Sequence, residues 1–168
     1  MSIDFAALIF PNNVVKKVAD YFQIIDAPAD RLTVLKRPLR TSDPNYSIGV
    51  WGERWEPDTT SYEMIGVDFA RTPTLERYLV TIQAFVRDAD EINGLIAHAV
   101  LAETIRTTLG SDATLRAQLG GLQATLNGTT KSLKKFYVRA GRYISNNVNG
   151  ENLYLSTNDL MLEVEKLS

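Results

Sequence analysis

The sequence predicts an α+β protein in which a mostly antiparallel β-sheet of about four to six strands packs against a long helix and an N-terminal helix. Three observations support this fold class. Apolar and polar residues alternate over residues 76–87, which is typical of a strand. An apolar pattern with helical spacing follows at once, over residues 89–109. Near the end of the chain, Asn149-Gly150 separates two further alternating stretches, as in a tight hairpin.

The chain begins with a predicted helix and a short strand. Asn12 or Asn13 is a suitable N-cap for a helix over residues 13–25, whose apolar residues recur at spacings near three and four. Residues 31–39 then predict a strand that Pro38 stops, because proline lacks the amide donor that a ladder needs.

The middle of the chain predicts a loop and a hairpin. Residues 40–46 contain an Asp-Pro-Asn turn signal, and residues 47–57 and 61–70 read as the two strands of a hairpin. All six prolines precede residue 74. We therefore expect a single α+β domain over residues 1–168, with residues 36–75 forming a strand-and-loop arm or an extended hairpin within it.

Three acids mark the junction between the clearest strand and the long helix. Asp88 is followed three residues later by Glu91, which resembles a capping box, and Asp90 and Glu91 fall in the first helical turn, where negative charge is favourable. A divalent cation site is the alternative, but the spacing of a calcium loop is absent. We expect Asp88 to be the helix cap and Gly110 to end the helix.

The rest of the chain predicts one short helix and two long strands. Ser111 is the expected cap of a helix over residues 112–119, which a glycine pair ends. Residues 132–145 and 152–166 are the two strands of the closing hairpin, and Asn127-Gly128-Thr129 is read as a turn.

Composition excludes several classes of protein. The net charge of −2 argues against a strongly basic nucleic-acid binder, and no apolar run reaches the roughly 18 residues of a membrane span. The absence of cysteine removes disulfides, thiolate nucleophiles and cysteine-ligated metals. It fits a reducing compartment or a particle assembled in one. The first residues lack the basic start and cleavage site of a signal peptide.

No catalytic, cofactor-binding or metal-binding motif is found in the sequence. His98 is the only histidine, no G-x-S-x-G elbow accompanies it, and it lies in an apolar helical stretch, so we expect it to pack. Asp88 is the tempting acid–base partner for His98, but ten helical residues separate them by roughly 15 Å along the axis. We expect no enzyme and no cofactor.

Trp51 and Trp55 lie on the same side of a predicted strand. Tryptophans in this arrangement bind sugars or bases, fill a core, or lie at a subunit interface. The two residues are therefore candidates for a subunit interface, and a small non-catalytic ligand-binding module is an alternative function.

The closing hairpin carries opposite charges on its two strands. Basic residues on the first strand face acids on the second, which permits cross-strand pairing, intersubunit pairing or a phosphate-binding surface. The further interface candidates are Lys134, Lys135, Arg139, Glu163 and Glu165. The 89–109 helix is apolar around nearly its whole circumference, and one sheet face covers only one stripe of it. We therefore expect a homo-oligomer.

The chain resembles the tail terminator, or tail completion, proteins of long-tailed bacteriophages. The resemblance rests on RYLVTIQAFVRDADEINGLIAHAVLAETIRTTL as a strand leading into a long helix, and on SLKKFYVRAGRYISNNVNGENLYLSTNDLMLEVE as a closing hairpin. Together these stretches cover about residues 76–166, after a leading helix and a strand-rich middle. Other phage neck and head–tail connector proteins share the pattern and are an alternative.

The resemblance implies a structural virion protein without catalysis. Such a protein forms a ring, usually a hexamer, that caps the tail tube, ends tube polymerisation and provides the surface that joins tail to head. The implied partners are further copies of itself, the tail tube protein and a connector or neck protein. The implied location is the tail–neck region of the virion, after assembly in the host cytoplasm. The ring leaves room for DNA to pass without sequence-specific binding, and no membrane is involved.

Overall fold

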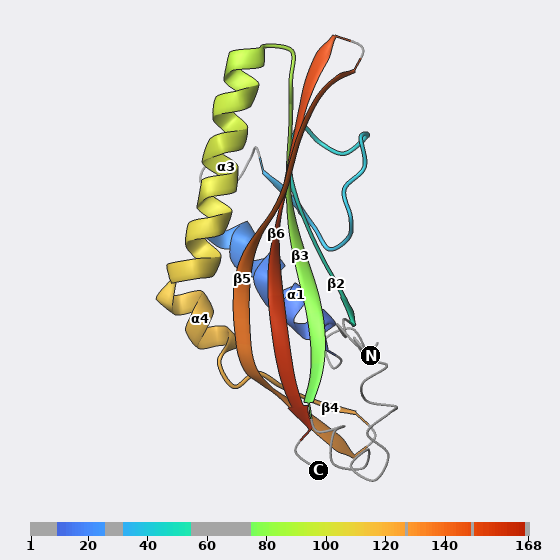
Figure 1. Cartoon of the computed structure of the whole chain (residues 1–168), viewed down its shortest axis with the longest axis vertical. Helices are drawn as coiled ribbons and strands as arrows, with labels where there is room; N and C mark the ends of the chain where they lie inside the picture. Colours follow the sequence, from blue (N-terminus) through green and yellow to red (C-terminus); the bar gives the residue numbers. More distant parts are fainter. Residues whose placement is uncertain (1–9, 26–31, 55–74, 127, 149, 167–168) are drawn as a thin grey trace.

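A computed structural model gives the architecture of the chain, and it describes residues 10–25, 32–54, 75–126, 128–148 and 150–166. Six strands in these residues form one sheet in the order β1-β2-β3-β6-β5-β4 (Figure 1). The chain is α+β, as the sequence predicted. The elements are α1 (Asn12–Ile25), β1 (Thr33–Leu35), β2 (Tyr46–Arg54), β3 (Leu75–Asp88), α3 (Glu91–Ser111), α4 (Ala113–Leu119), β4 (Gln123–Leu126), β5 (Thr129–Val148) and β6 (Glu151–Lys166).

The sheet is antiparallel except at one edge. β6 lies between β3 and β5 and pairs antiparallel with both over most of its length. The predicted closing hairpin is confirmed, and Gly150 has the positive φ of 80° that a tight turn there requires. β1 pairs with β2 in parallel. The short strand β4 was not predicted, and Gly128, with φ 76°, lies in the turn between it and β5.

The three helices of the described residues, α1, α3 and α4, pack on one face of the sheet. Their buried residues join the helix-facing residues of the strands in one core cluster, which includes Phe22 of α1, Leu109 of α3, Leu119 of α4 and Leu160 of β6. The opposite face of the sheet carries no helix among the described elements (Figure 1). We call this opposite side the outer face of the sheet. It includes Leu153 and Leu155, because residues alternate between the two faces along β6.

Of the hairpin predicted for the middle of the chain, the structure describes only the first strand, β2. β2 pairs with β3 and β1, and its predicted hairpin partner, residues 61–70, lies outside the described residues. Residues 46–54 therefore belong to the sheet. Of the predicted arm over residues 36–75, residues 55–74 are not described, so an arm there stays a prediction.

The cap of the long helix is Asp90 and not Asp88. Asp90 has an extended backbone, and its carboxylate accepts a hydrogen bond from the amide of Asn93 at 2.9 Å. The prediction of Asp88 was wrong because β3 continues to Asp88, which still pairs with Asn152. The Asp88 carboxylate instead accepts from the amide of Asp90 at 2.8 Å and stabilises the turn between strand and helix.

Replacing Asp90 with alanine should destabilise the protein by roughly 0.5–2 kcal/mol, because one amide at the helix start loses its acceptor. Asp88→Ala is the matched control and should cost less, since its carboxylate lies outside the first helical turn. Urea denaturation of both variants measures the difference. A larger loss for Asp88→Ala would show that Asp88 is the dominant cap after all.

The boundary between α3 and α4 also differs from the sequence prediction. α3 continues through Gly110 to Ser111, and Asp112, not Ser111, caps α4 by accepting from the amide of Leu115 at 2.9 Å. The Tyr21 hydroxyl donates to the same carboxylate at 2.7 Å and lowers the pKa of Asp112. Asp112 thus ends one helix, begins the next and links both to α1.

Candidate functional site

Five neighbouring apolar residues of α3 face away from the core. Ile92, Leu95, Ile96 and Val100 are 68%, 48%, 58% and 61% exposed, and Ala99 is exposed between them. Their spacings of three and four residues make them one continuous surface, which we call the α3 apolar face. Soluble monomers rarely expose large continuous apolar patches, so this face is a candidate surface for a protein partner.

The sheet covers only one side of α3, as the sequence predicted. The buried residues of this 21-residue helix are Gly94, His98, Ile105, Thr108 and Leu109. Gly94 and His98 lie against β6, and Ile105 and Leu109 belong to the core cluster, whereas the α3 apolar face is exposed. No described element covers that face. α3 therefore carries more apolar residues than the core of its own subunit buries.

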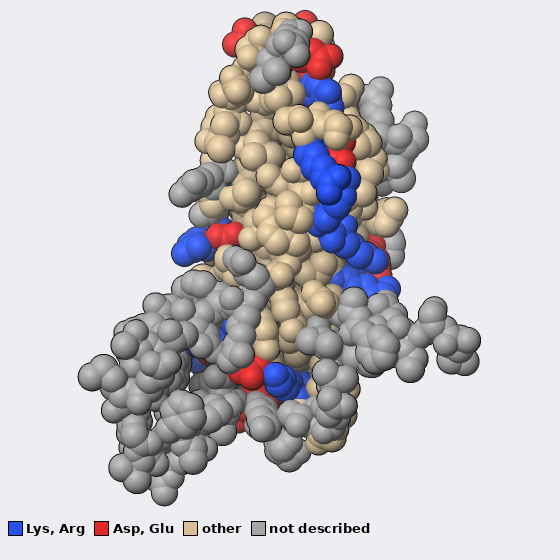
Figure 2. All heavy atoms as spheres, turned by 90° about the vertical axis from the view of Figure 1, so that its right-hand side faces the viewer, with Lys and Arg blue, Asp and Glu red and all other residues tan. Residues whose placement is uncertain are grey.

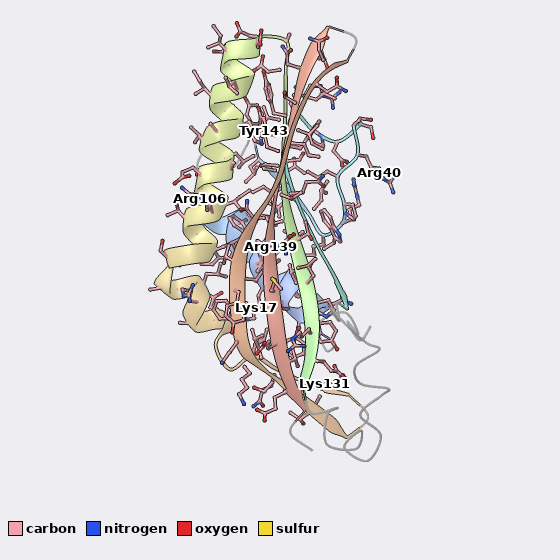
Figure 3. The ribbon with its side chains drawn as sticks, in the orientation of Figure 1. Lys17, Arg40, Arg106, Lys131, Arg139 and Tyr143 are labelled. Atoms are coloured by element: carbon pink, nitrogen blue, oxygen red, sulfur yellow. The ribbon has the colours of Figure 1, made fainter. Side chains whose placement is uncertain are left out.

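A groove of about 360 Å³ lies between α3 and β5, beside the α3 apolar face. Leu95, Ala99 and Ala102 of the helix line one side, and Tyr143 of β5 lines the other (Figure 3). Glu103 and Arg106 also line the groove and form an ion pair at 2.6 Å. The groove therefore extends the apolar surface of α3 toward the closing hairpin.

The shape of β5 contributes to this groove. The register of β5 with β6 shifts between Ala140 and Tyr143, which is the signature of a β-bulge. Within the bulge, Gly141 lies so close to β6 that an added Cβ would be 2.6 Å from the carbonyl oxygen of Thr157. A glycine is needed at this position because of the close approach of the two strands.

His98 closes the floor of the groove. Its Nε2 lies 2.9 Å from the Ser156 hydroxyl, and its ring lies between those of Tyr143 and Tyr154, with centroids at 5.3 and 6.0 Å. The residue is 3% exposed, which agrees with the predicted packing role, and burial lowers its pKa. No described carboxylate hydrogen-bonds to the ring, so these residues hold a Ser–His pair without the acid of a triad.

Stability should fall as the pH decreases from 7 to 5, and part of this fall should depend on His98. The lowered pKa means that the unfolded chain binds a proton at about pH 6.5 while the folded chain does not. The stabilisation is therefore fully present above about pH 6.5 and is lost as the pH falls toward the folded pKa. Urea denaturation of the natural protein and of His98→Gln across this range measures the effect. Identical pH profiles for the two proteins would contradict it.

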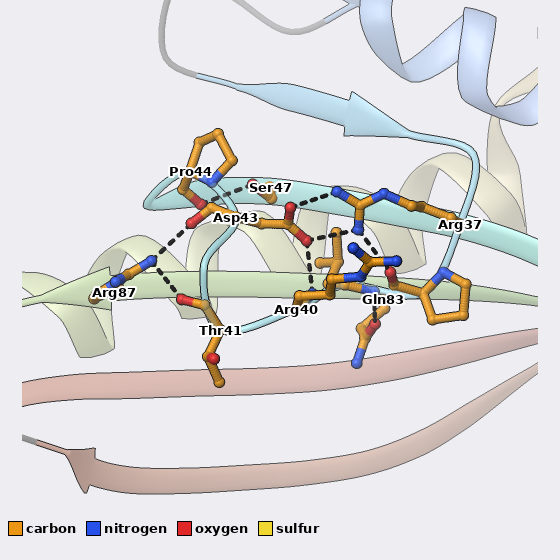
Figure 4. Close-up of polar contacts among 10 residues, drawn as sticks. Arg37, Arg40, Thr41, Asp43, Pro44, Ser47, Gln83 and Arg87 are labelled. Carbon is orange, nitrogen blue, oxygen red and sulfur yellow. Dashed lines mark hydrogen bonds and ion pairs between the residues drawn. The ribbon is translucent and has the colours of Figure 1, made fainter.

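Residues 36–45 form a strap that joins β1 to β2 across the outer face of the sheet (Figure 4). Because β1 and β2 are parallel, the chain must return along their length before β2 begins. Arg87 of β3 holds the strap by donating to the carbonyl oxygens of Thr41 and Asp43, both at 2.7 Å. The Leu39 amide donates to the Gln83 side chain at 3.0 Å.

An ion pair fixes the conformation of the strap. The Arg37 guanidinium donates to both carboxylate oxygens of Asp43, at 2.9 and 2.5 Å, and the Arg40 amide donates to the same carboxylate at 2.6 Å. These hydrogen bonds, that from Arg37 above all, lower the pKa of Asp43 to about 2. The strap therefore keeps this ion pair throughout the neutral and mildly acidic range. This ion pair could not be predicted from the sequence, because Arg37 and Asp43 lie six residues apart in a loop, where no periodic pattern indicates which side chains meet.

The strap and the adjoining sheet form a second candidate surface, which we call the strap face. It contains a hollow of about 210 Å³, and its lining residues are Leu39, Arg40, Thr41, Gln83, Phe85, Ile144, Asn146, Leu153 and Leu155. Basic side chains gather in a band on this side of the molecule (Figure 2). Lys36 and Arg40 of the strap are exposed, and no described carboxylate forms an ion pair with Arg40.

The charged interface candidates of the hairpin have partners within the chain. Lys134 lies 3.6 Å from Glu165, Arg139 lies 2.9 Å from Asp159, and Lys135 is opposite Glu163 in the ladder. Arg77 of β3 also lies 3.8 Å from Glu163. Cross-strand pairing, one of the alternatives from the sequence, therefore accounts for Lys134, Arg139, Glu163 and Glu165, whereas Lys135 has no ion pair among the described residues. A role for these charges between subunits stays a prediction.

Of the two tryptophans, the structure describes one. Trp51 is half-buried on β2 and points to the outer face, because its neighbour Val50 is buried in the core on the helix side. Trp55 lies outside the described residues, so the predicted pair is not assessed. Trp51 lines neither the groove beside α3 nor the hollow of the strap face.

The three acids at the start of α3 have structural roles. Asp88 and Asp90 accept hydrogen bonds from backbone amides, and Glu91 lies in the first helical turn. In the described part of the chain, no group of three His, Asp or Glu side chains is placed to hold a metal ion. Among the described helices, none is long and apolar enough to cross a membrane.

Comparisons with known proteins give no family for this chain. No family model matches, and no curated protein matches. Solved structures do match, and one of them covers 92% of this chain and 91% of its own, with 13% sequence identity and a TM-score of 0.43. The name of that protein states no function, and a similarity of this degree carries no argument about the role of the chain.

Proposed function

We propose that this protein is a structural virion component that forms a ring on the tail tube of a long-tailed phage. In this role it ends tube polymerisation and provides the surface that joins the tail to the head. The proposal rests on the resemblance of residues 76–166 to tail terminator proteins. Its partners are further copies of itself, the tail tube protein and a connector or neck protein. It acts without catalysis.

The α3 apolar face supports this proposal most directly. A helix that leaves four large apolar side chains about half exposed or more requires a second protein surface. A ring of identical subunits supplies such a surface at every junction, because each copy offers two different patches to its neighbours. A catalytic monomer has no comparable need for an uncovered helix.

The mass of the purified protein in solution tests the proposal. Light scattering across a concentration series should detect a closed assembly, with a mass close to six times the 18.7 kDa subunit. The subunit should be the minor species at high concentration. A protein that remains monomeric at every concentration, and that does not bind tail tubes, would contradict the proposal.

Two further experiments separate the proposed function from its two alternatives. A ligand-binding module that uses Trp51 and Trp55 would be a small species whose tryptophan fluorescence changes when ligand is added. Another connector protein of the neck would also form a ring, but it would not stop the growth of tail tubes. Fluorescence titration with a panel of sugars and nucleotides, followed by a tube-growth assay, distinguishes these outcomes.

A further inference from the structure

We propose that neighbouring copies of this protein meet head to tail, with the α3 apolar face of one copy docked on the strap face of the next. This inference rests on the proposed ring and identifies the two surfaces that form its junction. The occupant of each surface is therefore a second copy of the same chain. Three properties of the described residues support this pairing.

The first property is the position of the two surfaces. α3 packs on the helix side of the sheet, and the strap crosses the outer face (Figure 1). One molecule therefore cannot bring its own two surfaces together. A contact between two different patches on opposite sides of a subunit repeats from copy to copy, and it closes into a ring when the rotation permits.

The second property is the apolar character of both surfaces. The hollow of the strap face contains Leu39, Phe85, Leu153 and Leu155, and Ile144 at its edge is 50% exposed. α3 has 21 residues and is therefore about 30 Å long, so its outward side is long enough to span this hollow. An interface core of aliphatic and aromatic side chains with a charged rim is typical of stable protein contacts.

The third property is the opposite charge of the two surfaces. Asp90 and Glu91 begin α3, and among the described residues neither forms an ion pair. Arg106 is the first basic residue of the helix, and it is already paired with Glu103. Of the three cations on the strap, Lys36 pairs with Asp20 at 3.4 Å and Arg37 pairs with Asp43. Arg40 is the strap cation without an ion pair among the described residues. Acidic and basic rims that face each other select the partner and its orientation.

A symmetric contact between two α3 helices fits less well. Two copies of the α3 apolar face would meet with acids at both helix starts and without a free cation on either helix. The strap supplies the cation that α3 lacks. Arg40 is the most suitable one, because its side chain is exposed and its backbone amide, not its guanidinium, bonds to Asp43 (Figure 3).

Disulfide cross-linking tests the pairing without interference, because the natural chain has no cysteine. Protein carrying Ile96→Cys is mixed with protein carrying Ile144→Cys and oxidised over a range of concentrations. We expect a cross-linked dimer in the mixture, and a ladder of cross-linked species from one chain that carries both substitutions. Tyr137→Cys, which is equally exposed on the same strand but does not line the hollow, is the matched control and should cross-link poorly.

Charge reversal gives an independent readout. Glu91→Lys alone and Arg40→Glu alone should each raise the dissociation constant of the assembly by roughly tenfold. An equimolar mixture of the two variants should recover most of the lost affinity between subunits. One chain with both changes should recover it as well. Both positions are exposed, so the melting temperature reports whether folding is retained.

The outcomes separate this inference from the proposed ring. A ring by light scattering, without the Ile96–Ile144 cross-link and without charge rescue, overturns the inference and leaves the ring intact. Efficient cross-linking of Ile96→Cys protein to itself alone indicates the symmetric α3 contact and also overturns it. A protein that neither assembles nor cross-links at any concentration contradicts the inference and the proposed ring together.

Discussion

Replacing Ile96 and Val100 with lysine should strongly weaken self-association and leave the folded subunit intact. Both side chains are more than half exposed, so the core loses nothing, and lysine is at least as good a helix former as isoleucine or valine. At an interface, each large aliphatic side chain contributes about 1.5–3 kcal/mol when it is buried. Because the two residues are 58% and 61% exposed, roughly that share of the contribution is lost at each position, and assembly should weaken by about twentyfold or more.

Light scattering and thermal unfolding of the double variant measure these two effects separately. The matched control places the same two charges on α4, as Ala117→Lys with Gln118→Lys, where both residues are exposed and lie outside the α3 apolar face. This control should assemble like the natural protein. An unchanged dissociation constant for the α3 variant would mean that the exposed apolar residues of this helix do not form the junction.

Gly141→Ala should destabilise the subunit, whereas Gly110→Ala should stabilise it. A Cβ at Gly141 would lie 2.1 Å from the Thr157 hydroxyl and 2.6 Å from the Thr157 carbonyl oxygen, and the carbonyl moves only if the β5–β6 ladder moves with it. Overpacking of this kind costs typically 1–3 kcal/mol, which lowers the melting temperature of a protein of this size by roughly 2–12 °C.

Gly110 provides the control for this prediction because the same chemical change meets open space. Apart from its chain neighbours and the nearby backbone of its own helix, no atom lies within 4 Å of the position where its Cβ would be, and the residue is exposed near the end of α3. Alanine there should add up to about 1 kcal/mol through its higher helix propensity. Equal shifts of the melting temperature in the two variants would indicate that the close approach at the bulge does not determine stability.

The strongest periodic patterns predicted their elements well. The alternating run of β3, the helical run of α3 and the turn at Gly150 are each determined within one short stretch, so neighbouring residues are sufficient to identify them. Boundaries were less predictable. The strand pairing of Asp88 with Asn152 and the capping of α4 by Asp112 depend on hydrogen bonds that the local pattern does not specify.

The candidate surfaces were predictable to different degrees. The α3 apolar face was expected, because a helix that is apolar all round cannot be covered by one sheet. The strap was not expected as a structured surface. Its conformation depends on Arg37 and Asp43 within the loop and on Arg87 more than 40 residues away, and no sequence period links these positions. The groove beside α3 likewise requires the bulge at Gly141, which depends on the pairing of β5 with β6.

The growth of tail tubes in the presence of this protein tests the central claim most directly. Tail tube protein from the phage to which the proposed function assigns this chain is allowed to polymerise, and the tube lengths are measured by electron microscopy with and without the purified protein. We expect growth to stop on addition of the protein, with a ring of extra density at one tube end and no such effect from the Ile96→Lys, Val100→Lys variant. Tubes that continue to lengthen without density at either end would contradict the account.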